Sequence, residues 1–430
     1  MKRILSAFLI LVALGSWISA APLDPVLTSS DLWTQTPETF MAAGEPLGFE
    51  WTSAAKDSAR AAVKDMTAFG QKAVECVARF EGGALKQMTV VFYARGDAGE
   101  ISETQYDTLV RTSCEALNTA TQVKFAVRGK DQTSAVKAEG LVWTTPTGRY
   151  LLEYSKVREI KSIHIPFRAE FVRLEMTPPE KKLGLAAQIL QAPSGKFIGS
   201  EHVKRDPATG DVWIGDVPMV DQGQKGYCVV AATERVMRYY GNPVDANELA
   251  QVANSSAAGG TSYDAMYEAL KKLSTRLKVR VHEIEKTDYK DVVRLMADYN
   301  RNAKRYKMTP IPDQGNMISL SNVYEAMDGN VLKETRTKNP GDLTRFERSL
   351  EEHVNRGTPL LWTVMLGKIP EKGVSANAGG HMRLLIGYNA KTSEVLFSDT
   401  WGAGHELKRM PLADAYTMTT GTMSIEPMGT

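Results

Sequence analysis

The sequence predicts an α+β protein made of two units. In the second half, segments with helical periodicity come first and short apolar strands follow, an order typical of an α+β unit with an antiparallel sheet. The first half mixes helical segments with runs that alternate apolar and polar residues. Between the halves, a stretch rich in Gly, Pro and Ser runs from about Ala192 to Gly215. The predicted parts are a signal segment 1–20, an N-terminal α+β domain 21–190, a linker 191–214 and a second domain 215–430.

The N-terminus has the features of a secretory signal. Lys2 and Arg3 are followed by the apolar run Leu5–Leu14 and by small residues at Ser19–Ala21, which suit cleavage. The apolar run is shorter than the roughly 20 residues that span a bilayer, and no later run is long and apolar enough. We therefore expect an exported chain, periplasmic or secreted, without an integral membrane domain.

In the first unit, periodicity predicts helices over Ala54–Ala78 and Ser102–Leu117. Alternation and β-branched residues predict the strands Gln87–Tyr93, Gly140–Thr145, Tyr150–Tyr154 and Phe167–Met176. No cluster of chemically reactive side chains appears here, so the sequence leaves the role of this unit open.

In the second unit, a helix is expected to begin at Cys228 and to stop at Gly241. The further expected helices are Asn247–Val252, Ser262–Leu277, Asp291–Tyr306 and one capped by Asp342 or Thr344 that runs to Asn355. The expected strands are Lys278–Ile284, Pro359–Leu366, His381–Tyr388, Glu394–Ser398 and short strands up to Ile425.

The charge balance and the number of cysteines limit the classes of function and partner that we expect. The formal net charge is +2, and loss of Lys2 and Arg3 with the signal would leave equal numbers of basic and acidic side chains. Nucleic acid is therefore not expected as a partner, and the local basic cluster Arg301–Lys307 is interpreted as a solvated helix face. Of the three cysteines, Cys76 and Cys114 could form a disulfide, which would leave Cys228 free; three buried, reduced thiols are the alternative.

Four residues supply the parts of a thiol hydrolase in chain order: Gln222, Cys228, His381 and Asp399. A thiol at a helix N-terminus is surrounded by unpaired N–H groups and the positive end of the dipole, and both favour the nucleophilic thiolate. An imidazole can take the thiol proton and later protonate the leaving group. A carboxylate can fix the tautomer of that imidazole, and a side-chain amide can stabilise an oxyanion.

This second unit resembles the papain-fold cysteine peptidases. Gln222 stands six residues before Cys228, as the family's oxyanion glutamine does, and His381 follows Cys228 at about the family's separation of roughly 130–150 residues. Asp399-Thr400-Trp401-Gly402 is similar to the family's Asn-Ser-Trp-Gly. With an aspartate as the third residue after the cysteine and the histidine, the chain looks more like the bacteriocin-processing (double-glycine leader) branch of this fold family. The resemblance implies a papain-like peptidase domain over 215–430, with peptide or protein substrates and no cofactor.

The chain departs from these families at three points. Lys225-Gly226-Tyr227-Cys228-Val229 lacks the first cysteine and the tryptophan of Cys-Gly-Ser-Cys-Trp. The double-glycine branch tends to have proline after its aspartate, whereas Thr400 follows Asp399 here. That branch is also often fused to a transporter domain, whereas no membrane domain is expected in this chain. These departures bear on substrate preference more than on fold.

Several alternatives stay open from the sequence. Cys228 could be a core thiol, His381 an edge histidine and Asp399 a turn residue. Gln224 competes with Gln222 as the oxyanion donor, and His405 competes with His381 as the base. His202, His282 and His353 are read as surface residues, and no histidine pattern predicts a metal. The rival functions are an amine-accepting acyltransferase, similar to a transglutaminase, and a catalytically silent papain-fold binding module. The oligomeric state is not predicted.

Overall fold

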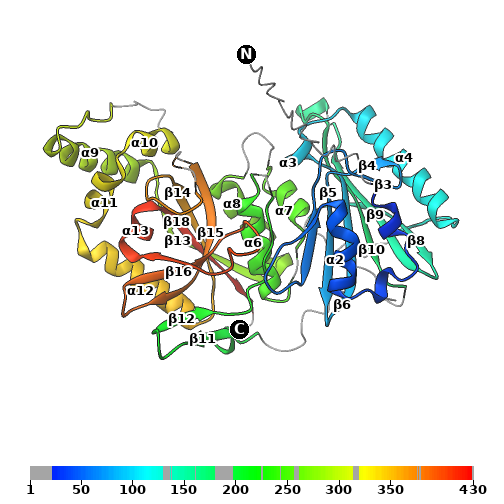
Figure 1. Cartoon of the computed structure of the whole chain (residues 1–430). Helices are drawn as coiled ribbons and strands as arrows, with labels where there is room; N and C mark the ends of the chain where they lie inside the picture. Colours follow the sequence, from blue (N-terminus) through cyan, green and yellow to red (C-terminus); the bar gives the residue numbers. More distant parts are fainter. Residues whose placement is uncertain are drawn as a thin grey trace, which may run out of the picture.

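The described residues form two eight-stranded antiparallel sheets, each accompanied by helices, and one small two-stranded sheet (Figure 1). The computed structural model describes residues 22–128, 136, 138–159, 161–179, 197–223, 226–242, 244–255, 261–312, 319–374, 376 and 379–428. The predicted α+β class is confirmed, because helices and antiparallel strands are mixed in both units. Within the described residues, no helix combines the length and the apolar character needed to cross a membrane. The expected signal segment 1–20 lies outside the described residues.

The first unit is built on a sheet with the order β1-β2-β5-β6-β10-β9-β8-β7, in which all neighbours are antiparallel. The strands are β1 (Phe49–Trp51), β2 (Ser58–Ala61), β5 (Glu75–Glu81), β6 (Ala84–Ala94), β7 (Ala126–Val127), β8 (Glu139–Thr145), β9 (Gly148–Val157) and β10 (Arg168–Thr177), with the small pair β3 (Thr67–Ala68) and β4 (Gln71–Lys72) beside it. The helices are α1 (Asp24–Leu27), α2 (Pro37–Gly44), α3 (Arg95–Ala98) and α4 (Glu103–Thr121), and the 3-10 turns are Leu32–Thr34, Glu45–Leu47 and Lys161–Ile163.

The two faces of this sheet differ in chemistry. On β5, Cys76, Ala78 and Phe80 point into an apolar core that also holds side chains of α2 and α4. Glu75 and Arg79 alternate with them and therefore point to the opposite face. That second face carries charged side chains and is covered by the second unit, as the ion pairs below establish.

The predicted helix Ala54–Ala78 is wrong, because the segment forms β2, β3, β4 and the start of β5. The β5 sequence alternates buried and partly exposed residues with period two, and Gly70 sits in a left-handed turn between β3 and β4. Sheet pairing outweighs the helical spacing here. The predicted helix at Ser102 is confirmed, and Ser102 forms a capping box with Gln105.

The second unit has a sheet with the order β11-β12-β15-β14-β18-β13, from which β16 and β17 continue beside β15. Its strands are β11 (Val203–Arg205), β12 (Asp211–Ile214), β13 (Val279–Lys286), β14 (Leu360–Leu366), β15 (Gly379–Asn389), β16 (Glu394–Ser398), β17 (Lys408–Pro411) and β18 (Thr419–Pro427). β11 and β12, after the 3-10 turn Gly199–His202, lie within the expected linker 191–214. The strands β11 and β12 thus join this stretch to the sheet, because they pair with each other and β12 pairs with β15.

The helices of the second unit are α6 (Cys228–Tyr239), α7 (Ala246–Val252), α8 (Tyr263–Leu277), α9 (Tyr289–Arg305), α10 (Leu320–Ala326), α11 (Gly329–Thr337), α12 (Pro340–Asn355) and α13 (Leu412–Met418). The last strands before Ile425 are thus interrupted by a helix. Asn339, not Asp342 or Thr344, caps α12, because Pro340 occupies its first turn. Residues of α6, α8 and α12 pack with β14, β15 and β18 in one core.

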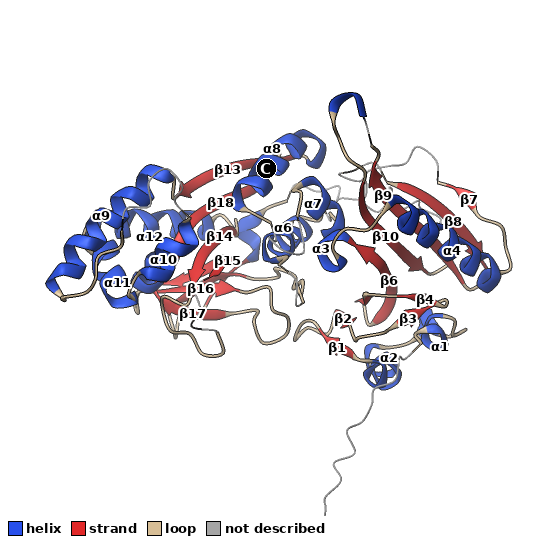
Figure 2. Ribbon diagram, turned by 90° about the horizontal axis from the view of Figure 1, so that it is seen from above, coloured by secondary structure: helices blue, strands red, loops and turns tan. Residues whose placement is uncertain are grey.

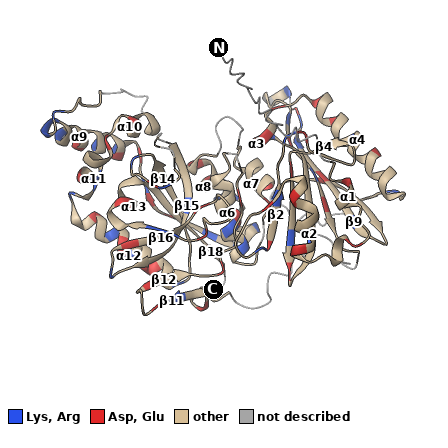
Figure 3. Cartoon of the chain, in the orientation of Figure 1, with Lys and Arg blue, Asp and Glu red and all other residues tan. Residues whose placement is uncertain are grey.

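Helices α6 and α7 lie between the two sheets in both views (Figures 1 and 2). Their buried residues contact both units. Val230 and Val236 belong to the core of the second unit, while Glu234 and Glu248 form ion pairs with arginines of the first unit. The basic cluster at the end of α9 is exposed, as interpreted, and stands at the outer end of the molecule (Figure 3).

Candidate active site

Cys228 is the first residue of α6, as expected. The thiol is partly buried beside His381, and burial alone would raise its pKa. A hydrogen bond with His381 and the charge of that ring lower the pKa, as do backbone N–H groups of Met382 and Val229, so that the net direction is downward. The helix start adds the positive end of its dipole. The site therefore favours a thiolate at position 228.

His381 lies on β15 opposite Val364 of β14, and its ring forms a hydrogen bond with Cys228 at the start of α6. Its Nε2 is 2.5 Å from Oδ1 of Asp399, so Nδ1 is the nitrogen on the side of Cys228. Burial alone would lower the pKa of His381, but hydrogen bonds to Asp399 and Cys228 raise it. The structure thus brings Cys228, His381 and Asp399 together although they are far apart in the sequence.

The strand register explains how Asp399 reaches His381. Leu384 on β15 pairs with Ser398 on β16, so the next position along each strand sets Arg383 opposite Asp399. Side chains two apart on a strand share a face, and His381 therefore lies on the face of Arg383. Asp399 is completely buried; burial opposes its charge, while His381, Arg383 and the N–H of Thr400 (3.0 Å) lower its pKa.

Arg383 is a buried cation that sequence reasoning missed. Its Nε is 2.9 Å from Oδ2 of Asp399, and two of its nitrogens lie 3.0 Å from the carboxylate of Glu371. The guanidinium also lies over the rings of Phe397 and Trp401. An arginine two residues after a candidate histidine on a predicted strand is the signal that could have found it, because both must share one face.

Trp401 covers the histidine. Its indole stacks on the His381 ring with a centroid separation of 4.6 Å and an angle of 16°. His381 is 7% exposed, so the indole helps to keep water from the ring and its hydrogen bond to Asp399. Exclusion of water strengthens the interaction between the buried charges.

Gln222 is held against the segment after β16. Its N–H donates to the carbonyl of Thr400 at 2.9 Å, and the Thr400 hydroxyl donates to its Oε1. That second bond fixes the orientation of the amide, so that the NH2 group is the side directed to other partners. The segment of Gln222 and the segment Asp399–Gly402 are therefore joined by the hydrogen bonds between Gln222 and Thr400.

Arg235 was also missed from the sequence. It is 1% exposed and lies on α6 two turns after Cys228. Its guanidinium donates to the carbonyls of Pro218 (2.8 Å) and Asp399 (2.6 Å) and to the hydroxyl of Ser398 (2.5 Å). Arg235 thus joins the helix of Cys228 to the backbone of Asp399; the seven-residue spacing, which repeats a helix face, was its signal.

The rival site residues fall elsewhere. Gln224 lies outside the described residues. His405 lies edge-on to the ring of Trp401. The ring that contacts the Asp399 carboxylate is that of His381. His353 is buried, with Nδ1 2.7 Å from the carbonyl of Ser349, so its assignment to the surface is wrong. Cys76 and Cys114 are free thiols rather than a disulfide. No group of three or more potential metal ligands occurs among the described residues.

One sequence family matches the part of the chain that holds this site. Residues 214–423, just under half of the chain, match the sequence model of the Peptidase_C39 like family, so the resemblance predicted for the C-terminal half is confirmed. No significant match to a curated protein was found.

Two solved structures are each similar to about half of this chain. One is the peptidase domain of Streptococcus ComA, a bifunctional ABC transporter involved in a quorum sensing pathway, with 14% identity, 49% of this chain and 99% of that chain covered, and a TM-score of 0.25. The other is xylellain, a cysteine protease from Xylella fastidiosa, with 11% identity, 52% and 90% covered, and a TM-score of 0.27. Both scores are below 0.5, so these likenesses add nothing to the family match.

Proposed function

We propose that this protein is an exported cysteine peptidase that hydrolyses peptide bonds through an acyl-enzyme on Cys228. The observation that carries the proposal is the continuous contact from the thiol at the start of α6 through His381 to the buried Asp399. The raised pKa of His381 and the lowered pKa of Cys228 both favour the thiolate–imidazolium pair that such chemistry starts from.

The proposed reaction follows from these roles. The Cys228 thiolate adds to the carbonyl carbon of the peptide bond, and the carbonyl electron pair moves onto oxygen. When the tetrahedral intermediate collapses, the C–N bond breaks and the amine leaves with a proton from the His381 imidazolium. His381 then removes a proton from water, the resulting hydroxide attacks the thioester, and the C–S bond breaks to release the acid and restore the thiolate.

Asp399 and Gln222 act on the charges that develop. Asp399 holds His381 by Nε2, which keeps Nδ1 toward the sulfur and stabilises the charged ring. The NH2 group of Gln222 and the N–H of Cys228 are the donors proposed for the oxyanion. Loss of one such donor typically costs ~3 kcal/mol of transition-state stabilisation.

The test is turnover of mixed-sequence peptides and an unfolded protein by the purified chain. We expect Cys228→Ala to abolish cleavage while the thermal unfolding transition stays nearly unchanged, and the Cys114→Ala control to keep activity. Retention of cleavage in Cys228→Ala would remove the proposal. Product that requires an added amine would instead favour the acyltransferase. Failure of an electrophile to label reduced Cys228 would favour the silent binding module.

A further inference from the structure

The turn that carries Gln222, residues 221–223, lies at the junction of the two units. On one side it contacts the second unit: Gln222 bonds to Thr400 as described, and Asp221 lies against Gly402, where a Cβ would be 3.2 Å from Oδ2 of Asp221. Oδ1 of Asp221 accepts the N–H of Gly223 at 2.8 Å and so closes the turn. The other side of the turn faces the sheet of the first unit.

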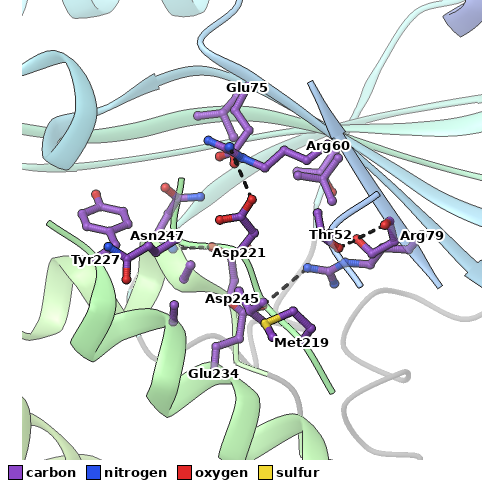
Figure 4. A pocket seen from close by; sticks show the side chains of 18 of the residues that line it. Thr52, Arg60, Glu75, Arg79, Met219, Asp221, Tyr227, Glu234, Asp245 and Asn247 are labelled. Atoms are coloured by element: carbon purple, nitrogen blue, oxygen red, sulfur yellow. Dashed lines mark hydrogen bonds and ion pairs between the residues drawn. The ribbon is translucent and has the colours of Figure 1, made fainter. Parts of the chain in front are cut away.

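Arg60 of β2 covers that other side (Figure 4). Its guanidinium pairs with Glu75 on β5, and its Nη1 is 3.9 Å from Oδ2 of Asp221. Burial opposes the charge of Arg60, but Glu75 and then Asp221 outweigh it, so that the pKa of Arg60 is raised and the group stays a cation. The 14% exposure of its side chain indicates a charge that is largely withdrawn from water.

Gly223 shows how closely Arg60 approaches the backbone. It has a φ of +65°, and a Cβ at this position would be 2.3 Å from Nη2 of Arg60. The arginine therefore occupies the space in which a side chain at 223 would lie. A turn with a positive φ, closed by Asp221 and covered by a cation, has little freedom to change the direction of Gln222.

Tyr227, the residue before Cys228, is held by the first unit as well. Its side chain is 4% exposed, and a Cβ on Gly96 of α3 would be 1.7 Å from its Oη. The ring thus packs directly on the backbone of α3. Contacts from the first unit therefore reach both the turn with Gln222 and the residue from which α6 begins.

Two further groups of contacts fix the first unit in this place. The N–H of Ala54, between β1 and β2, donates to Oε1 of Glu406 at 2.7 Å, in the loop that follows Trp401. Farther along α6 and α7, Arg79 pairs with Glu234 at 3.4 Å, and Arg173 pairs with Glu248 at 3.2 Å. Glu234 and Glu248 are both buried, so each of these two contacts depends on the arginine being in place.

From these contacts we infer that the first unit is a working part of the active site: Arg60 is a positioning residue that orients Gln222 through Asp221 and Gly223, and Gly96 sets Cys228 through Tyr227. The inference rests on the proposed function. It assigns to the first unit a permanent role in transition-state stabilisation, in place of a removable propeptide or an inhibitor.

The experiment compares Arg60→Gln with Arg79→Gln in the full chain. Both arginines lie on the same sheet face and pair with acids, but Arg79 contacts Glu234 in the middle of α6 and not the Gln222 turn. We expect Arg60→Gln to lower kcat roughly tenfold or more, as for a weakened oxyanion donor, with KM within about twofold. Arg60→Lys should recover part of the loss, and Arg79→Gln should keep kcat within about twofold.

Alkylation of Cys228 by iodoacetamide separates positioning from structural damage. This reaction forms no oxyanion, so its rate and pH profile should be unchanged in Arg60→Gln, whereas a disordered site would change both. Gly96→Ala, which displaces Tyr227, should by contrast slow the alkylation itself by roughly fivefold or more. Urea midpoints of all variants show whether each remains folded.

The outcomes are distinct. An unchanged kcat in Arg60→Gln, or equal losses in Arg60→Gln and Arg79→Gln, would overturn the inference alone. Absence of turnover in the wild-type chain, with Cys228 no more reactive than Cys114, would overturn the proposed function and the inference with it. A selective loss of kcat with normal alkylation, restored in part by lysine, would support both.

Discussion

At the scale of single residues, Asp399 interacts with two cationic groups at once. One oxygen contacts His381 at 2.5 Å and the other lies 2.9 Å from Arg383. Arg383 is in turn held by Glu371, so the carboxylate stays ionised in a place where burial alone would raise its pKa. An ionised Asp399 stabilises the charged form of His381 more than a neutral amide would.

Replacement of Asp399 by asparagine tests that effect. Thiolate forms as the pH rises through the lowered pKa of Cys228, and the imidazolium is lost as the pH rises through the raised pKa of His381. We expect Asp399→Asn to move the descending limb of the pH–kcat/KM profile to lower pH and to reduce activity roughly tenfold or more, or ~1.4 kcal/mol. The exposed Asp264→Asn is the control, and an unmoved descending limb would contradict this role.

At the scale of elements, α6 is the structural centre of the site. Its first residue is Cys228, its apolar side chains enter the core of the second unit, and its polar side contacts the first unit. Arg235 fastens it to Pro218 and to the end of β16. Without this arginine, two backbone carbonyls would lose a donor in a buried place.

We expect Arg235→Met to lower the free energy of unfolding by ~3 kcal/mol, because each buried acceptor left unsatisfied costs about 1–3 kcal/mol. Equilibrium urea denaturation measures this change. Arg301→Met, at an exposed position of α9, should change stability by no more than about 0.5 kcal/mol. A loss below about 1 kcal/mol for Arg235→Met would mean that the helix is held by its apolar face alone.

The elements also show what the sequence could and could not predict. The helix at Cys228 and the strand at His381 were predicted because local signals and periodicity agree there. The segment Ala54–Ala78 was predicted wrongly, because its strands are fixed by pairing with β1 and β6. Arg235 and Arg383 were missed because a charged side chain in a regular element resembles a solvated one until its partners are known.

At the scale of the whole molecule, charged side chains fill much of the junction between the units. Glu175 of β10 and Glu234 of α6 are both buried there. Burial raises the pKa of Glu175 to about 7, against the effect of Arg173, and raises the pKa of Glu234 to about 8, against that of Arg79. The junction is thus sensitive to pH in a way that an apolar interface is not.

The two raised pKa values determine how the stability of the folded chain changes with pH. In the unfolded chain these carboxyls titrate near their ordinary 4.5. Between that value and about 7 to 8 the folded state binds more protons, so a rise in pH favours unfolding. We expect the urea midpoint to fall by roughly 0.5 M from pH 5 to pH 8. Glu234→Gln should reduce this fall and the exposed Glu115→Gln should not; a midpoint that rises over this range would contradict the assignment.

The arrangement of the units was beyond sequence reasoning for a physical reason. Gln222, Cys228, His381 and Asp399 could be selected because their spacing is similar to that of a known family. The contacts of Arg60 and Gly96 with the Gln222 turn and Tyr227 join residues more than a hundred positions apart, and no local pattern in either segment marks the other.

The most direct test of the thiolate–imidazolium pair is the pH dependence of Cys228 alkylation, followed by mass spectrometry of its peptide so that Cys76 and Cys114 do not contribute. We predict a half-maximal rate below the ordinary thiol pKa of about 8.5, because the pKa of Cys228 is lowered, and a shift to higher pH in His381→Ala. A wild-type midpoint at or above about 8.5, or no shift in His381→Ala, would contradict the account.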